Sequence, residues 1–140
     1  MQTTNSRSYQ FEIPRPHMAK VKSKDTGPEL LLRSLLRDMG FRGYRIHFEK
    51  LPGRPDIVFT RRKRVIFVHG CFWHGHNCPA GSHRPKSNEE YWDAKLLRNV
   101  ERDQKHLSEI IALGWQVLVV WECQLKNHEF VRKIITNFMR

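Results

Sequence analysis

The densest chemistry in this 140-residue chain lies in residues 69–78, which hold three histidines, two cysteines and two large aromatic residues. Cys71, His76 and Cys78 have the spacing C-x4-H-x-C, and thiolate and imidazole are the ligands that zinc prefers. Cys123 is the remaining cysteine of the chain and can supply a fourth ligand. We therefore expect a closed, structural zinc site and call residues 69–78 the zinc loop. The alternative is that these cysteines are buried free thiols beside a histidine.

Three residues in or near the zinc loop are suited to acid–base chemistry. Asp56 opens a short apolar run, His69 closes the next one, and His74 lies inside the loop. A carboxylate and an imidazole can meet around a hydrated Mg²⁺ ion, and imidazole can take a proton from an attacking water or return one to a leaving oxygen. This cluster predicts phosphodiester hydrolysis, and it leaves open which histidine is the base and which the acid.

Three aromatic residues stand in the same basic context: Phe72 and Trp73 in the zinc loop, and Trp92 further along the chain. Aromatic side chains can wedge between base pairs and unstack them. Trp92 can equally belong to the hydrophobic core. The aromatic residues are therefore candidates for contact with DNA, with core packing as the alternative.

The net charge narrows the class of partner. The chain carries a formal charge of +11 at pH 7, with a sequence pI near 10.1. The basic residues are spread along the whole chain and are not gathered on one amphipathic helix, so nucleic acid is favoured over an anionic membrane surface. Residues 1–8 are polar and lack the apolar core of a secretory signal, so we expect a cytoplasmic protein.

The elements that must position these residues are predicted from periodicity and capping. Residues 26–39 are expected to form a helix that Thr26 caps, with Glu29 completing a capping box and Gly40 ending it. Glu29 is either a cap alone or a group that reaches the catalytic centre. The apolar runs 57–59 and 65–68 are joined by four basic residues, which predicts a hairpin that brings Asp56 beside His69.

The other elements follow from the same patterns. Residues 41–48 alternate like an edge strand, residues 79–88 are expected to be an exposed loop, and residues 91–111 have helical spacing. Residues 115–121 are predicted to be a fully buried strand, and a last helix from residue 127 is expected to bury Phe130, Val131, Ile134, Ile135 and Phe138. We expect residues 25–140 to form a single domain, and residues 1–24 to be a mobile arm that folds over DNA or is simply solvated.

Several long strings of the sequence form a recognisable set: residues 24–26 with Glu29, and residues 51–56, 65–74, 99–103 and 114–123. These strings resemble one family, the very-short-patch repair (Vsr) DNA mismatch endonucleases of bacteria. The resemblance covers most of the chain from residue 18 onward.

This resemblance implies an α/β fold with a restriction-endonuclease-like three-layer core, in which helices flank a mixed central β-sheet. It implies an Mg²⁺-dependent enzyme that nicks one strand 5′ to the thymine of T:G mismatches arising from deamination of 5-methylcytosine. Such an enzyme would act as a monomer on double-stranded DNA in the nucleoid, with mismatch-repair proteins as further partners. The alternatives are a zinc-stabilised DNA-binding module without catalysis and a nickase of the same fold with a different target.

The resemblance also implies residue roles. Asp56 and the backbone carbonyl of Val68 would bind Mg²⁺, and His74 would be the essential proton-transfer residue. His69 and Glu29 would complete the catalytic centre. The structural zinc would be held by Cys71, His76, Cys78 and Cys123, and the residues that enter the duplex would be Phe72, Trp73 and Trp92.

Overall fold

The computed structural model describes residues 24–140, so the predicted arm, apart from Lys24, lies outside the described residues. None of the helices in this part of the chain is long and apolar enough to span a membrane. The elements follow in the order α1 (Gly27–Asp38), β1 (Ile57–Phe59), β2 (Arg64–His69), α2 (Pro79–Ser82), α3 (Glu89–Ala112), β3 (Gln116–Trp121), the 3-10 helix η2 (Glu122–Lys126) and α4 (His128–Met139).

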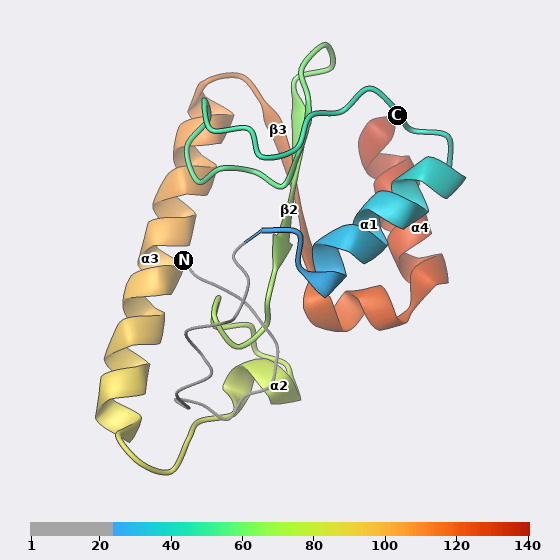
Figure 1. The fold of residues 1–140 in the computed structure, drawn as a ribbon. Coiled ribbons are helices and arrows are strands. Elements are labelled where there is room, and N and C mark those ends of the chain that lie inside the picture. The colour runs from blue at the N-terminus through green and yellow to red at the C-terminus, as the bar shows by residue number, and fades with distance from the viewer. Residues whose placement is uncertain (1–23) are drawn as a thin grey trace.

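The three described strands form one mixed sheet in the order β1-β2-β3. β1 pairs antiparallel with β2, with Ile57 opposite Ile66, which confirms the predicted hairpin. β2 pairs in parallel with β3 along its whole length, ending at His69 opposite Trp121. In Figure 1, α3 lies on one side of the sheet while α1 and α4 lie on the other, so the predicted three-layer α/β arrangement is confirmed.

The two faces of the sheet build two separate cores because successive side chains of a strand point to opposite faces. Ile66 belongs to the cluster that packs with α1 and α4. Its neighbours Val65 and Phe67 belong to the cluster that includes Ile110 of α3. β2 is therefore covered on both faces. The zinc loop begins at the end of this central strand.

The helix ends agree with the sequence signals. The Thr26 hydroxyl accepts the Glu29 N–H at 3.3 Å and caps α1, as predicted. The Glu29 carboxylate accepts the N–H of Asp25, not that of Thr26, so it closes the cap one residue earlier than a standard capping box would. Gly40 follows α1 with φ 86°, a conformation that glycine adopts without strain.

One strand prediction was wrong, and a second was right in its position but wrong in its burial. Residues 41–48 form only a single bridge, between Arg45 and Val58, because Gly43 and His47 have positive φ and break the extended backbone on both sides of it. The predicted fully buried strand 115–121 is β3, in which only Val120 is fully buried. β3 is an edge of the described sheet, so one of its sides has no neighbouring strand there.

Two smaller predictions also need correction. The segment predicted as an exposed loop, residues 79–88, begins with the one-turn helix α2, which starts directly after Cys78. In α4, Val131 and Ile135 are buried as predicted, but Phe130 is 41% exposed because it lies in the first turn of the helix, away from the side that packs on the core.

The basic turn between β1 and β2 has a structural role. Arg62 Nη1 donates to the carbonyl of Met139 at 3.3 Å, and Arg64 Nη2 donates to the carbonyl of Arg140 at 2.9 Å. Cations at the C-terminal end of a helix satisfy its free carbonyls and its dipole. This turn lies at the opposite end of β2 from His69, so it is remote from the zinc loop (Figure 1).

Candidate functional site

The four predicted zinc ligands meet in one cluster. One ligand atom from each of Cys71, His76, Cys78 and Cys123 lies within 4.8 Å of all the others. Zinc–sulfur bonds of about 2.3 Å place tetrahedral ligands roughly 4 Å apart, so only small movements separate this arrangement from a closed site. Burial raises the pKa of the Cys71 thiol, so a metal ion that takes it as thiolate must displace its proton. The donor set fits zinc.

The surrounding residues hold this cluster in place. The Trp121 ring stacks on the His76 ring at 4.2 Å, with the two planes 16° apart. Cys78 caps α2, and a Cβ atom at Gly81 in that helix would lie 1.9 Å from the His76 carbonyl oxygen. Only glycine lets α2 pack this closely. β3 and η2 deliver Cys123 to the loop because β3 runs parallel to β2 and both strands end side by side.

A pair of carboxylates forms the second part of the site. Asp56 precedes β1, and its Oδ2 accepts the backbone N–H of Val68 at 2.6 Å, continuing the hairpin ladder past its last backbone pair. Glu29, at 8% exposure, approaches from the first turn of α1. Burial, reinforced by the neighbouring Glu29 charge, raises the pKa of Asp56 well above its usual range, and burial also raises the pKa of Glu29. Two desolvated carboxylates with oxygen donors suit a hard divalent cation.

A small polar network fixes Glu29 from behind. Arg33 Nη2 lies 2.8 Å from Asp25 Oδ1 and 3.5 Å from Glu29 Oε1. His47 Nε2 binds the same Asp25 oxygen at 2.9 Å. Arg33 lowers the pKa of both Glu29 and Asp56, so its charge partly offsets the repulsion between the two carboxylates. Sequence patterns did not single out this network.

The two predicted catalytic histidines lie face to face. Their rings stack at 3.9 Å with planes 2° apart. His74 Nδ1 lies 2.5 Å from Asp103 Oδ2. Burial lowers the pKa of His69 well below its usual value, and burial also lowers the pKa of His74, against the opposing effect of Asp103. Near neutral pH both rings are therefore mostly neutral and able to accept a proton.

Asp103 is a site residue that the sequence reasoning missed. It belongs to α3 and contacts a residue 29 positions earlier in the chain. A signal was available, since Asp103 falls on the apolar stripe of this helix. A carboxylate among core positions is unusual unless it is paired. The stripe is formed by Leu96, Val100, Asp103, Leu107 and Ile110.

The three predicted intercalating residues pack against one another. Phe72 and Trp92 are 4% and 3% exposed, whereas Trp73 is half-buried. Their rings meet edge to face, with centroids between 5.0 and 5.9 Å apart. The buried Trp92 Nε1 has no hydrogen-bond partner among the described residues. In this arrangement the aromatic cluster is a small core, and contact with a base pair would require its rings to move outward.

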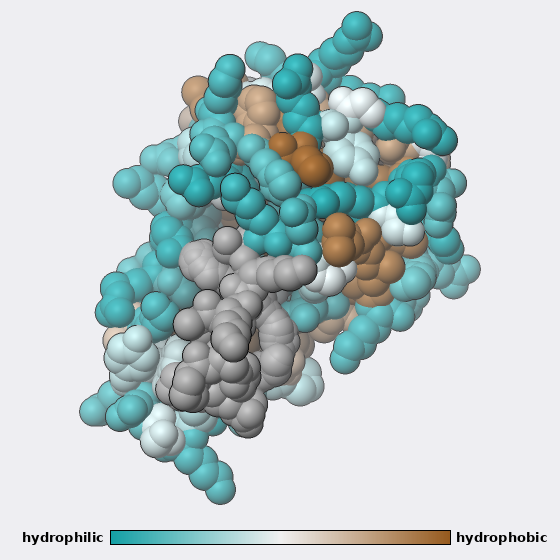
Figure 2. Space-filling model, in the orientation of Figure 1, coloured by the Kyte–Doolittle hydropathy of each residue, from teal (hydrophilic) through white to brown (hydrophobic). Residues whose placement is uncertain are grey.

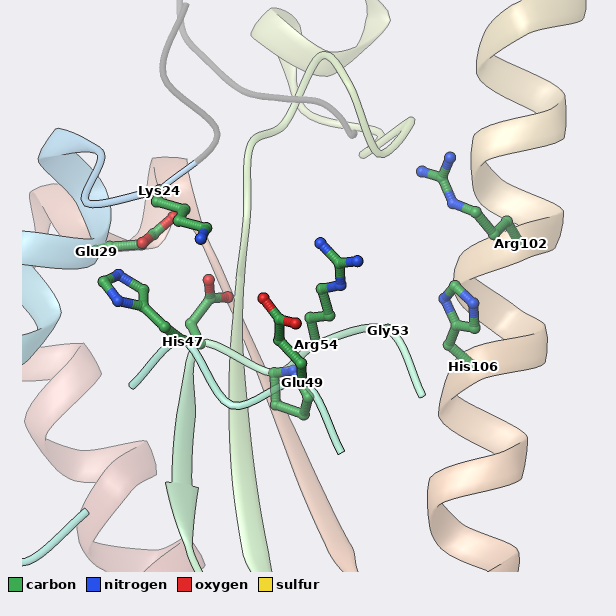
Figure 3. Close-up of a pocket in the computed structure, with 10 residues that line it drawn as sticks. Lys24, Glu29, His47, Glu49, Gly53, Arg54, Arg102 and His106 are labelled. Carbon is green, nitrogen blue, oxygen red and sulfur yellow. The ribbon is translucent and has the colours of Figure 1, made fainter. Parts of the chain in front are cut away.

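A cavity of about 500 Å³ opens beside the carboxylates. Figure 3 shows Glu29 and His47 on one side of it and two α3 residues, Arg102 and His106, on the other, with Arg54 between them. The surface in the view of Figure 2 is mostly hydrophilic, with a few apolar patches. The cavity is lined by Lys24, Glu29, His47, Glu49, Gly53, Arg54, Pro55, Asp56, Arg102 and His106.

Comparison with known proteins identifies relatives of this chain. The family model described as DNA mismatch endonuclease Vsr matches residues 9–80. The chain is 44% identical over 138 residues to the type II nicking enzyme V.NmeAIP of Neisseria meningitidis, covering 99% of this chain and 92% of the relative. It is 43% identical over 113 residues to the DNA mismatch endonuclease Vsr of Escherichia coli, covering 81% and 71%.

A further relative and one solved structure agree with these matches. The type II nicking enzyme V.XorIIP of Xanthomonas oryzae is 51% identical over 110 residues, which is 79% of each chain. The catalytic domain of the homing endonuclease I-Bth0305I superposes with a TM-score of 0.57 at 23% identity, covering 81% of this chain and 94% of that domain. The structural match establishes a shared endonuclease fold.

Proposed function

The chain belongs to the Vsr family of DNA mismatch endonucleases and is a DNA endonuclease, and on this premise we propose that it nicks one strand of duplex DNA 5′ to the thymine of a T:G mismatch. Such mismatches arise when 5-methylcytosine is deaminated. The observation that carries the proposal is the convergence of Asp56 with Glu29, and of His69 with His74, around the end of β2. These are the groups that phosphodiester hydrolysis requires.

The carboxylate pair is the proposed cation site. Asp56 and Glu29 face each other with their charges only partly balanced by Arg33, and the Val68 backbone lies against Asp56. We assign Mg²⁺ to these carboxylates and the Val68 carbonyl, because Mg²⁺ prefers hard oxygen ligands. A cation bound there supplies Lewis-acid stabilisation of the phosphate oxygens.

The histidine pair is the proposed proton relay. Since a carboxylate only accepts hydrogen bonds, Asp103 holds the proton of His74 on Nδ1 and leaves Nε2 as the acceptor. His74 can thus take a proton from the attacking water. His69, stacked against it and held by the edge of Trp121, is placed to serve the leaving oxygen or to hold the phosphate.

The zinc cluster has a supporting role in this proposal. Four protein ligands complete a tetrahedron, so zinc would have no open position for substrate. His74 lies between two of the ligands, Cys71 and His76, in the sequence. We therefore assign zinc the task of holding the loop rigid, so that His74 remains at a fixed distance from the carboxylates.

Mismatch recognition is assigned to the aromatic cluster. Phe72, Trp73 and Trp92 line one side of the zinc loop, and we propose that they leave their mutual contacts and enter the duplex beside the mismatch. Unstacking costs little at a mismatched pair compared with a matched one, which gives a physical basis for selectivity.

We further propose that the protein acts as a monomer in the bacterial cytoplasm, on nucleoid DNA, with mismatch-repair proteins as partners.

A strand-specific nicking assay tests the proposal. Duplexes with one end-labelled strand and a central T:G, T:A or C:G pair are incubated with Mg²⁺, and the cut is mapped on a sequencing gel. We expect a nick in the thymine strand of the T:G duplex, on its 5′ side, and none in the matched duplexes. Equal nicking of matched DNA would leave only a nickase with a different target.

The non-catalytic alternative is tested with the same substrate. Asp56→Asn is expected to lower nicking by about a thousandfold, roughly 4 kcal/mol of transition-state stabilisation, while DNA binding is retained. Asp38→Asn, at the exposed end of α1, is the matched control and is expected to nick like the wild type. If chelation of Mg²⁺ changes nothing and no product forms, a DNA-binding module remains.

A further inference from the structure

Backbone strain is concentrated around the cavity. Five described residues other than glycine have positive φ, and three of them adjoin the carboxylate pair: Asp25, His47 and Arg54. A side chain at positive φ is unfavourable, and such residues gather where function requires a particular direction of a group. Arg54 is the most unusual, because it precedes Pro55, and a residue before proline is normally extended.

The Arg54 side chain points into the cavity and is free to bind a ligand. Figure 3 shows its guanidinium between the Glu29 side and the α3 side of the cavity. Among the described residues, no hydrogen bond or ion pair of this side chain is formed. The positive charge that acts on Asp56 and Glu29 is that of Arg33, so the charge of Arg54 is not engaged by the carboxylates.

We propose that Arg54 binds a backbone phosphate of the cut DNA strand, within one nucleotide of the scissile bond, and so holds the strand over the carboxylate pair. The planar guanidinium fork matches phosphate geometry in two parallel hydrogen bonds. Arg54 is only two residues before Asp56 in the chain. A phosphate bound by Arg54 would therefore be held close to the proposed cation site. Arg102 and His106 of α3 line the opposite side of the same space. This inference rests on the proposed nuclease function.

The test uses a strain-matched pair of variants in the full-length protein. Arg54→Gly removes the side chain and relieves the positive φ. Lys63→Gly does the same in the basic turn, where φ is 53° and the residue lies outside the cavity. We expect both variants to be as thermally stable as the wild type. Nicking should fall about 10- to 100-fold in kcat/KM for Arg54→Gly only, with partial recovery in Arg54→Lys.

A second measurement identifies the contact without requiring cleavage. Affinity for duplexes that carry one neutral methylphosphonate, placed in turn at the scissile position and at the position on either side of it, is measured in Ca²⁺. At one of these positions the methylphosphonate should lower the affinity of the wild type. The affinity of Arg54→Gly, which already lacks the contact, should not fall further there. The salt dependence of binding by Arg54→Gly should be weaker by about one phosphate contact.

The outcomes separate this inference from the nuclease proposal. Additive losses at all three positions, or nicking by Arg54→Gly equal to that of Lys63→Gly, would overturn the role of Arg54 and leave the nuclease proposal standing. If the wild type nicks nothing, the nuclease proposal fails, and the binding cycle still decides whether Arg54 contacts a phosphate.

Discussion

The cysteine–histidine cluster and the carboxylate pair both lie near the end of β2, yet they are built on opposite principles. The four soft donor atoms of the cysteine–histidine cluster lie within 4.8 Å of one another, so the chain itself could surround a metal ion there. The carboxylate pair is only partly balanced by Arg33, borders a cavity of about 500 Å³ and has three residues at positive φ around it. A centre that only supports the fold can be closed and complete, whereas a centre that handles substrate must stay open and electrostatically unbalanced.

The largest expected effect is loss of the closed centre. Cys123→Ser removes a ligand that arrives from a different part of the chain, so the loop loses its attachment to β3. We expect bound zinc, measured by atomic spectroscopy, to fall from one equivalent to well below it, with a large drop in melting temperature, because structural zinc contributes on the order of 10 kcal/mol in small domains. His128→Asn, in an exposed position, is the control. Unchanged melting would show that the cluster is not structural.

Nicking activity should be lost in a variant of the open centre whose closed centre remains intact. His74→Ala is expected to reduce nicking by about 10²- to 10⁴-fold, the range for general acid–base groups, while zinc content and melting temperature stay near those of the wild type. Single-turnover nicking of the T:G duplex gives the rate. If zinc content falls together with activity, His74 supports the metal cluster and the division between the two centres is wrong.

The Mg²⁺ requirement of nicking tests whether the carboxylate pair binds the cation. Glu29→Gln removes one of the two carboxylate charges, so we expect the Mg²⁺ concentration for half-maximal nicking to rise several-fold, about 1 kcal/mol or more of binding. Glu101→Gln on the exposed side of α3 is the matched control. An unchanged Mg²⁺ requirement with reduced activity would assign Glu29 to the substrate and not to the cation.

The smallest expected effect is a shift along the pH axis. Asp103 raises the pKa of His74 against the effects of burial and of the Arg102 charge, so Asp103→Asn leaves these effects unopposed and lowers that pKa further. The limb of the pH–rate profile that reports His74 should therefore move to lower pH, whether His74 is the base or the acid. A limb that does not move would show that Asp103 has no part in proton transfer by His74.

Features encoded over short sequence distances were predictable. The Thr26 cap, the β1–β2 hairpin and the approach of Asp56 to the end of β2 depend on turn length and on register within a few residues, so residue type and spacing determine them. The zinc ligands could be chosen because the chain has only three cysteines. The positive φ at His47 was not foreseeable from alternation alone, so the strand predicted over residues 41–48 does not form.

The sequence by itself therefore determined the chemistry that is available: thiols and imidazoles as soft ligands, carboxylates, and an excess of positive charge. The tertiary structure alone decided which groups face one another. It paired His74 with Asp103, brought Arg33 behind Glu29, packed Phe72 against Trp92 and aimed Arg54 into the cavity. These contacts depend on how helices pack on the sheet and on the direction of single side chains, and residue type and local spacing do not fix either of them.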